Sequence, residues 1–337
     1  MTALLMACSA GKTTSTPAIE DFNYSVDRFA DIEILRYRVP GFEELTLKQK
    51  ELIYYLNQAA LEGRDILYDQ NNKYNLSIRR TLEAVYENYK GDRKSTDFEQ
   101  LTTYLKRIWM GNGIHHHYSE DKFVPEFGSV YFAEAVKSID PAKLPLHPGQ
   151  TVDQFLAEIS PVIFDPALYP KRTNQAEGVD LIKTSGNNYY ENVTQAEVEA
   201  FYGKMKNPAD STPVSFGLNS KLVKENGVLV EKTYKVGGLY TAAIQRIVGW
   251  LEKAAGVAEN PSQKLVINIL IDFYKTGSLK TYDEYSIKWV EDLASSVDFV
   301  NGFTETYGDP LGMKGSWESI VNFKNTEATK RTEIISA

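Results

Sequence analysis

The sequence predicts an α+β protein, with a mostly helical first half and a second half that mixes helices with strands. Helix-start signals recur through the first 200 residues, whereas strand signals concentrate after residue 210. The 337 residues are 42% apolar and 24% charged, which provides a sizeable core for one large domain or two ordinary ones. The net charge of −8 argues against a nucleic-acid partner, because such a partner requires a basic surface.

The helices are predicted mainly from capping boxes, in which Ser or Thr is followed three residues later by Glu or Gln. The two side chains satisfy backbone N–H groups that the first helical turn leaves unpaired. Five such pairs occur: Thr46/Gln49, Thr96/Glu99, Thr151/Gln154, Thr194/Glu197 and Thr281/Glu284. With the apolar patterns around them, they predict helices at residues 46–69, 76–89, 96–110, 128–138, 151–159, 194–205, 240–255, 261–276 and 281–295.

Strands are predicted in the second half. Asn226-Gly227 separates two β-prone runs, residues 214–224 and 228–236, and this dipeptide between such runs indicates a hairpin. Residues 297–307 form a third strand candidate, and residues 160–190 are expected to be a long, partly irregular connection.

The N-terminus carries the only cysteine, Cys8. The apolar and small residues of 4–7 before it match the end of a bacterial lipoprotein signal, although the apolar region is short and no basic residue precedes it. We therefore expect residues 1–28 to be a truncated lipoprotein signal and tether. Lipidation of Cys8 would place the protein in the bacterial cell envelope. The alternative is a cytoplasmic protein with an idle thiol.

Three consecutive histidines, His115 to His117, are the most conspicuous candidate for a metal site. The side chains of adjacent residues point in different directions on a helix and to alternate faces on a strand, so three adjacent histidines rarely coordinate one metal ion. The only other histidine, His147, lies beside a proline. We expect a polar loop at residues 115–117 and no metal site there.

The strongest functional signal lies near the C-terminus. If residues 297–307 form a strand, Glu305 and Tyr307 share one face. Asp309-Pro310-Leu311-Gly312 follows as a tight turn. A carboxylate at such a strand end can hold an ammonium group, and a phenol can donate a hydrogen bond to a developing oxyanion. The alternative is a strand that runs into solvent, with Glu305 as a surface charge and Tyr307 as a rim aromatic.

The run from Glu305 to Glu318 resembles the first signature region of the dipeptidyl peptidase III family. These zinc exopeptidases remove dipeptides from the N-terminus of oligopeptides. The signature reads Glu, a small residue, Tyr, any residue, Asp-Pro, any residue, Gly, any residue, a basic residue, Gly, two further positions and Glu, and all its fixed positions are present. Further segments similar to bacterial members are 42–69, 112–127 and 237–240, so the resemblance covers about residues 29–337.

The resemblance implies a role for three residues. Glu305 matches the acidic residue that binds the free N-terminus of the substrate, and Glu318 matches a second acidic residue near the N-terminal subsites. Tyr307 matches the catalytic tyrosine that stabilises the tetrahedral intermediate.

The resemblance also implies an architecture of two lobes around a wide cleft. One lobe is rich in helices and holds the zinc. The other has a small antiparallel or mixed β-barrel-like core with helices around it. We expect residues 29–337 to be the substrate-binding lobe, helical over about 29–160 and mixed over about 190–325, with the β core formed mainly by the second half.

The zinc motif of the family, His-Glu-x-x-Gly-His, does not occur in the 337 residues. We therefore expect a truncated chain whose partners are an oligopeptide substrate and a missing C-terminal zinc lobe. Zinc is expected only in the full-length enzyme, and this chain alone is expected to be inactive. The alternative is a non-catalytic, peptide-binding envelope lipoprotein.

Overall fold

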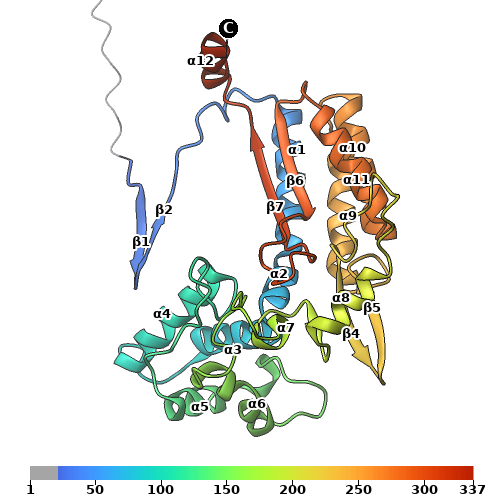
Figure 1. Ribbon diagram of the computed structural model, residues 1–337. Helices are drawn as coiled ribbons and strands as arrows, with labels where there is room; N and C mark the ends of the chain where they lie inside the picture. Colours follow the sequence, from blue (N-terminus) through green and yellow to red (C-terminus); the bar gives the residue numbers. More distant parts are fainter. Residues whose placement is uncertain (1–21, 337) are drawn as a thin grey trace, which may run out of the picture. The chain divides into compact units, whose positions relative to one another are not determined.

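The computed structural model describes residues 22–336, which divide into two units between Val39 and Pro40 (Figure 1). In the first unit, strands β1 (Ser25–Phe29) and β2 (Ile32–Leu35) pair as an antiparallel hairpin. Residues 25–28 of β1 belong to the segment predicted as a tether. Cys8 lies outside the described residues, so its lipidation and the proposed anchor stay predictions.

The second unit contains helices from its start to its end, and they follow most of the predicted ranges. The helices of its first part are α1 (Leu47–Glu62), α2 (Arg64–Asn71), α3 (Asn75–Asn88), α4 (Thr96–Gly111), α5 (Ser129–Lys137) and α6 (Val152–Phe164). The later helices are α7 (Leu181–Thr184), α8 (Gln195–Gly203), α9 (Thr241–Gly256), α10 (Pro261–Thr276), α11 (Leu279–Glu291) and α12 (Thr326–Ser336).

Three of the five predicted capping boxes are present, at Thr46, Thr151 and Thr194. The other two helices are capped by an earlier residue than predicted: Ser95 caps α4, which begins at Thr96 as expected, and Ser278 caps α11, which begins two residues before the predicted start. Each serine hydroxyl accepts a hydrogen bond from the backbone N–H three residues later, which leaves the predicted threonine inside the first turn.

The predicted helix over 46–69 is two helices, α1 and α2, that meet at Gly63. A Cβ atom at Gly63 would lie 2.0 Å from the indole ring of Trp317, so only glycine allows the ring to pack there. The side chain of Gln70, on α2, accepts a hydrogen bond from the Trp317 N–H at 2.8 Å and donates one to the Gly315 carbonyl at 2.9 Å. Helix α2 is thereby fixed to the chain that leads into β7 (Trp317–Phe323).

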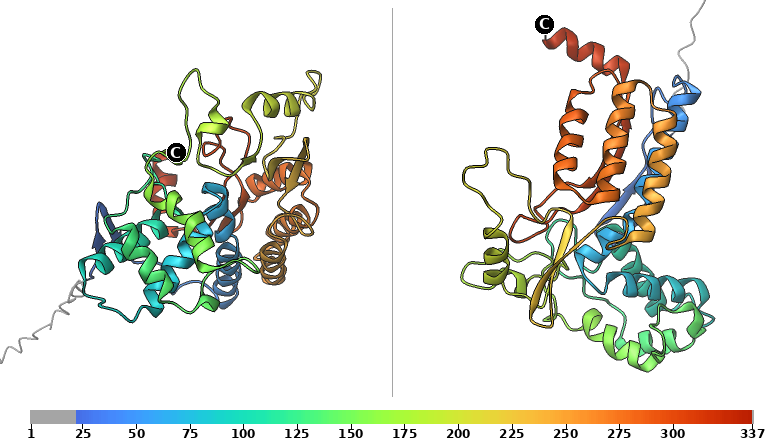
Figure 2. Two further views of the ribbon diagram at one scale, coloured as in Figure 1. Left: turned by 90° about the horizontal axis from the view of Figure 1, so that it is seen from below. Right: turned by 90° about the vertical axis from the view of Figure 1, so that its right-hand side faces the viewer.

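One hydrophobic core joins α1, α9, α10 and α11 to the antiparallel pair of β6 (Val297–Phe303) and β7. Figure 1 and the right-hand view of Figure 2 show the three late helices side by side, with α1 and the two strands next to them. The fully buried residues of this core include Leu52, Ile247, Leu270, Phe273 and Phe303.

A second core fills the space among α3, α4, α5 and α6, with Leu82, Leu105, Phe132 and Ile159 fully buried. Helix α2 contributes to both cores, since Ile66 belongs to the first and Tyr68 to the second. A smaller cluster packs α8 against the sheet of β3 (Tyr190–Glu191) and β4 (Ser220–Glu225).

The predicted β-barrel-like core is wrong for the described residues, although the α+β class is confirmed. Seven strands form three separate small sheets, β1-β2, β3-β4-β5 and β6-β7, and none closes on itself. Closure requires a continuous, staggered set of strands, whereas β3 contributes only two residues and the β6-β7 pair has no third strand. The predicted hairpin at Asn226-Gly227 is confirmed as the turn between β4 and β5 (Val228–Thr233).

Among residues 22–336, no helix combines the length and the apolar character needed to cross a membrane.

Candidate functional site

The segment that carries the candidate residues leaves the sheet earlier than predicted. Strand β6 ends at Phe303 instead of at residue 307. Two further backbone hydrogen bonds, Thr304 N–H to Ser316 O at 3.1 Å and Ser316 N–H to Glu305 O at 2.8 Å, extend the pairing with the chain before β7. Tyr307 then lies in a turn, so the prediction that strand alternation aligns it with Glu305 is wrong.

The predicted turn at Asp309 to Gly312 is confirmed, with the Gly312 N–H bonded to the Asp309 carbonyl at 2.9 Å. The Asp309 side chain is 1% exposed and organises the loop. Its carboxylate accepts the N–H groups of Leu311, Met313 and Lys314 and the hydroxyl of Tyr190, at 2.8 to 3.1 Å. The fixed aspartate of the signature therefore has a structural role here.

The basic residue of the signature, Lys314, is fully buried. Its ammonium group donates to the hydroxyls of Tyr202 and Ser220 and lies 3.8 Å from the Glu231 carboxylate. Burial lowers the pKa of Lys314 to about 8. This lysine anchors the signature loop to β4 and α8 and does not face solvent.

Glu305, Tyr307 and Glu318 lie close enough to one another to interact electrostatically. Glu318 is partly buried on β7, opposite Gly302 of β6, whereas Glu305 is exposed and Tyr307 is 67% exposed. Partial burial and the nearby Glu305 carboxylate raise the pKa of Glu318 to about 7. Partial burial and the same two carboxylates raise the pKa of Tyr307. The structure thus brings together the three residues that the sequence predicted, by a turn and not by strand alternation.

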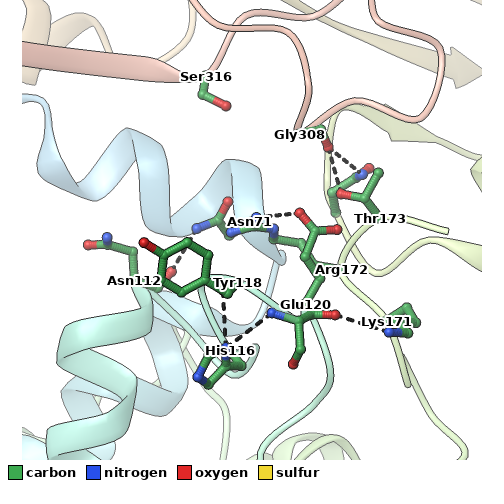
Figure 3. Close-up of polar contacts among 12 residues, drawn as sticks. Asn71, Asn112, His116, Tyr118, Glu120, Lys171, Arg172, Thr173, Gly308 and Ser316 are labelled. Atoms are coloured by element: carbon green, nitrogen blue, oxygen red, sulfur yellow. Dashed lines mark hydrogen bonds and ion pairs between the residues drawn. The ribbon is translucent and has the colours of Figure 1, made fainter. Parts of the chain in front are cut away.

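Two charged residues that sequence reasoning missed also act on Tyr307. The Arg172 guanidinium lowers the pKa of the phenol, and the Glu120 carboxylate raises it. These two form an ion pair at 2.5 Å, shown in Figure 3. They are 52 residues apart and sit in irregular segments, so no periodic pattern could have paired them.

The peptide group between Gly308 and Asp309, one residue beyond Tyr307, is held by two side chains of the same region. Thr173 Oγ1 and Asn187 Nδ2 each donate to the Gly308 carbonyl at 3.0 Å. Figure 3 shows Thr173 beside Gly308, with Arg172 next to it in the chain. Gly308 itself is closely packed, since a Cβ there would lie 3.1 Å from Ser316 Oγ and 3.2 Å from the Tyr189 hydroxyl.

The three histidines do not form one polar loop, which corrects the prediction for His115. This residue is 1% exposed, its Nε2 lies 2.9 Å from the Tyr169 carbonyl, and burial lowers its pKa to about 4. His116 instead accepts the N–H groups of Tyr118 and Ser119 at its Nδ1 atom, and the side chain of His117 is exposed. In residues 22–336, no group of three or more His, Cys, Asp or Glu side chains could hold a metal ion.

A cavity of about 650 Å³ adjoins the signature loop. Thr306, Gly312 and Met313 line one wall, and the loop of residues 206–216, including Phe216, lines the other. Of the three candidate residues, Tyr307 thus lies on a turn whose neighbouring residues, Thr306 and Gly312, border a hollow in the surface.

Comparisons with known proteins point to one group. Residues 182–336 match the family model described as Peptidase family M49. The dipeptidyl peptidase 3 of Dictyostelium discoideum is 22% identical over 329 residues, which cover 88% of this chain and 44% of that protein. The Nematostella vectensis protein of the same name is 21% identical and covers 93% and 48%, respectively. The Rattus norvegicus protein is 30% identical over 100 residues.

Two solved structures share the fold. The structure of DPP III from Caldithrix abyssi has a TM-score of 0.56 at 20% identity and covers 88% of this chain and 43% of that chain. The structure of dipeptidyl-peptidase III from Corallococcus sp. strain EGB has a TM-score of 0.56 at 16% identity, with 89% and 43% covered. The chain spans about half the length of the relatives that it matches along most of its own length.

Proposed function

Because the chain belongs to the dipeptidyl peptidase III family, we propose that residues 29–337 are the substrate-binding portion of a zinc-dependent peptidase that releases N-terminal dipeptides from oligopeptides. Members of this family are metallopeptidases. The observation that carries the proposal is the carboxylate pair of Glu305 and Glu318, because Glu318 has its pKa raised to about 7 by partial burial and by Glu305.

The carboxylate pair suits the α-ammonium group of a peptide. Two carboxylates that repel each other gain from a cation between them, since it relieves the repulsion and forms charge-assisted hydrogen bonds. A peptide held by its free N-terminus has a fixed register. The distance between this anchor and the reacting carbonyl would then determine that two residues lie before the cleaved bond.

Tyr307 is the proposed donor to the oxyanion. Its pKa is raised above the usual 10.0 by partial burial and by the two carboxylates, so the phenol keeps its proton at neutral pH. Its side chain is 67% exposed and therefore accessible to a bound peptide. A hydrogen bond from the phenol would strengthen as negative charge develops on the carbonyl oxygen.

Zinc is not assigned to any described residue. The M49 family is zinc-dependent, but residues 22–336 contain no cluster of ligating side chains that fits the ion.

Binding of a tetrapeptide to the 337-residue chain, measured by calorimetry, tests the proposal. The peptide is used with a free and with an acetylated N-terminus. We expect the free form to bind at least about tenfold more tightly, and Glu305→Gln and Glu318→Gln each to remove most of that preference. Glu87→Gln, at an exposed position on α3, is the matched control and should bind like the original chain. Equal affinity for the free and acetylated peptides would exclude the proposed role of the carboxylate pair.

A further inference from the structure

We propose that Arg172 is a positioning residue for Tyr307. It holds the groups that fix the Gly308 carbonyl, and it supplies the positive charge that offsets the carboxylates around the phenol. This role rests on the proposed function, in which Tyr307 donates to the oxyanion. The proposal assigns a function to the Arg172–Glu120 ion pair, which is largely buried and lies outside the signature region.

Arg172 is held rigidly. Its side chain is 11% exposed and pairs with the Glu120 carboxylate, whose side chain is 18% exposed. The Arg172 N–H also donates to the Glu120 carbonyl at 2.9 Å, so the backbone and the side chain of one residue both bind the other. Glu120 adopts a positive φ of 60°, a conformation that costs free energy for a residue with a side chain and that these bonds help to maintain.

The segment that contains Arg172 also fixes the backbone at Gly308, the residue after Tyr307. The Arg172 carbonyl accepts the Asn187 N–H at 3.0 Å, and the next residue is Thr173. The side chains of Asn187 and Thr173 are the two donors to the Gly308 carbonyl. A displacement of Arg172 would therefore move both groups that fix the Gly308–Asp309 peptide group, one residue beyond Tyr307.

The charges that act on Tyr307 come from four segments. Glu305 lies in the segment of Tyr307 itself and Glu318 lies on β7, whereas Arg172 and Glu120 belong to two further segments that their ion pair joins. The three carboxylates raise the pKa of the phenol and Arg172 lowers it. Removal of the arginine charge alone would leave the phenol facing three carboxylates, which would weaken its ability to stabilise a developing negative charge.

The test measures the titration of Tyr307 itself in the 337-residue chain, without peptide or zinc. Tyrosine labelled with ¹³C at the ζ position reports phenol ionisation by NMR, and Tyr307→Phe assigns the resonance. Arg172→Met should raise the pKa of Tyr307 by about half a unit or more, and Arg172→Lys should largely restore it. Glu120→Gln should shift it in the opposite direction.

The opposite signs separate the proposed role from a purely structural one, because loosening of the loop would shift the titration of both variants alike. If Arg172→Met does not fold, the direction of the shift in Glu120→Gln still decides the matter. An unchanged or upward shift in Glu120→Gln, or a titration in Arg172→Lys that is displaced as far as in Arg172→Met, would overturn the inference.

The outcome is independent of the peptide-binding assay. Opposite shifts without any preference for a free N-terminus would leave the charge arrangement intact and refute the proposed function. A preference for the free N-terminus without opposite shifts would refute only the role of Arg172.

Discussion

At the scale of single residues, Glu318 shows how strongly its surroundings determine what a carboxyl group does. Glu305 and Glu318 are chemically alike and lie in one site, but only Glu318 is partly buried, and its pKa is raised from 4.5 to about 7. The folded protein therefore favours the protonated form of Glu318 over a pH range in which the unfolded chain is ionised. Ionisation in the folded state costs free energy, which a bound cation would offset.

This cost predicts the pH dependence of Glu318→Gln. Below about pH 4.5 Glu318 is protonated in both states, so the substitution should change stability little. As pH rises from 4.5 to about 7, the original chain loses stability that the glutamine variant keeps. We expect the variant to be more stable by about 1 kcal/mol at pH 8, after allowance for solvent screening. Urea unfolding at pH 4 and pH 8 measures the difference, and equal differences at both pH values would contradict it.

At the scale of elements, the junction of α1 and α2 depends on one glycine. The indole ring of Trp317 occupies the space that a side chain at Gly63 would need. Helix propensity alone favours alanine at this position, but the steric conflict with a buried ring is larger than the difference in propensity.

Gly63→Ala is therefore expected to destabilise the protein by about 2 kcal/mol or more, measured by thermal or urea unfolding. Gly249→Ala is the matched control, because a Cβ atom at Gly249, inside α9, would meet nothing within 4 Å beyond its own helix and chain neighbours. That substitution should stabilise the protein by up to about 1 kcal/mol. The prediction is contradicted if Gly63→Ala and Gly249→Ala change the free energy of unfolding in the same direction.

Local sequence signals predicted most helices and the β4-β5 hairpin, but they could not predict contacts between residues that are distant in the sequence. The capping box at Thr151 and the Asn226-Gly227 turn are read from a few neighbouring residues and are confirmed. At Thr96 a neighbouring serine competed for the cap, and local sequence could not decide between them. Strand β7 was missed although its buried and exposed residues partly alternate.

The candidate site was predictable only in part. The signature run contains Glu305, Tyr307 and Glu318, but their proximity depends on a turn whose anchor, Tyr190, is distant in sequence. The pairing of Arg172 with Glu120 is likewise a product of the tertiary fold. Sequence spacing could identify the chemistry of the site but not the groups that hold it in place.

At the scale of the whole molecule, the described residues contain the proposed substrate-binding groups without a metal site. We therefore predict that the purified 337-residue chain, incubated with zinc and then dialysed, retains less than stoichiometric zinc and releases no dipeptides. Metal analysis and a dipeptide-release assay check the two parts. Stoichiometric zinc together with dipeptide release would contradict the prediction, and zinc without release would indicate a non-catalytic ion.

The two hydrogen bonds of the Gln70 amide have a mechanical consequence. They tie α2, which contributes to both main cores, to the backbone at Gly315 and Trp317. Glu318 is the next residue in the chain. A rotation of α2 would therefore pull on the backbone directly before Glu318, which couples the packing of the helical core to one carboxylate of the pair.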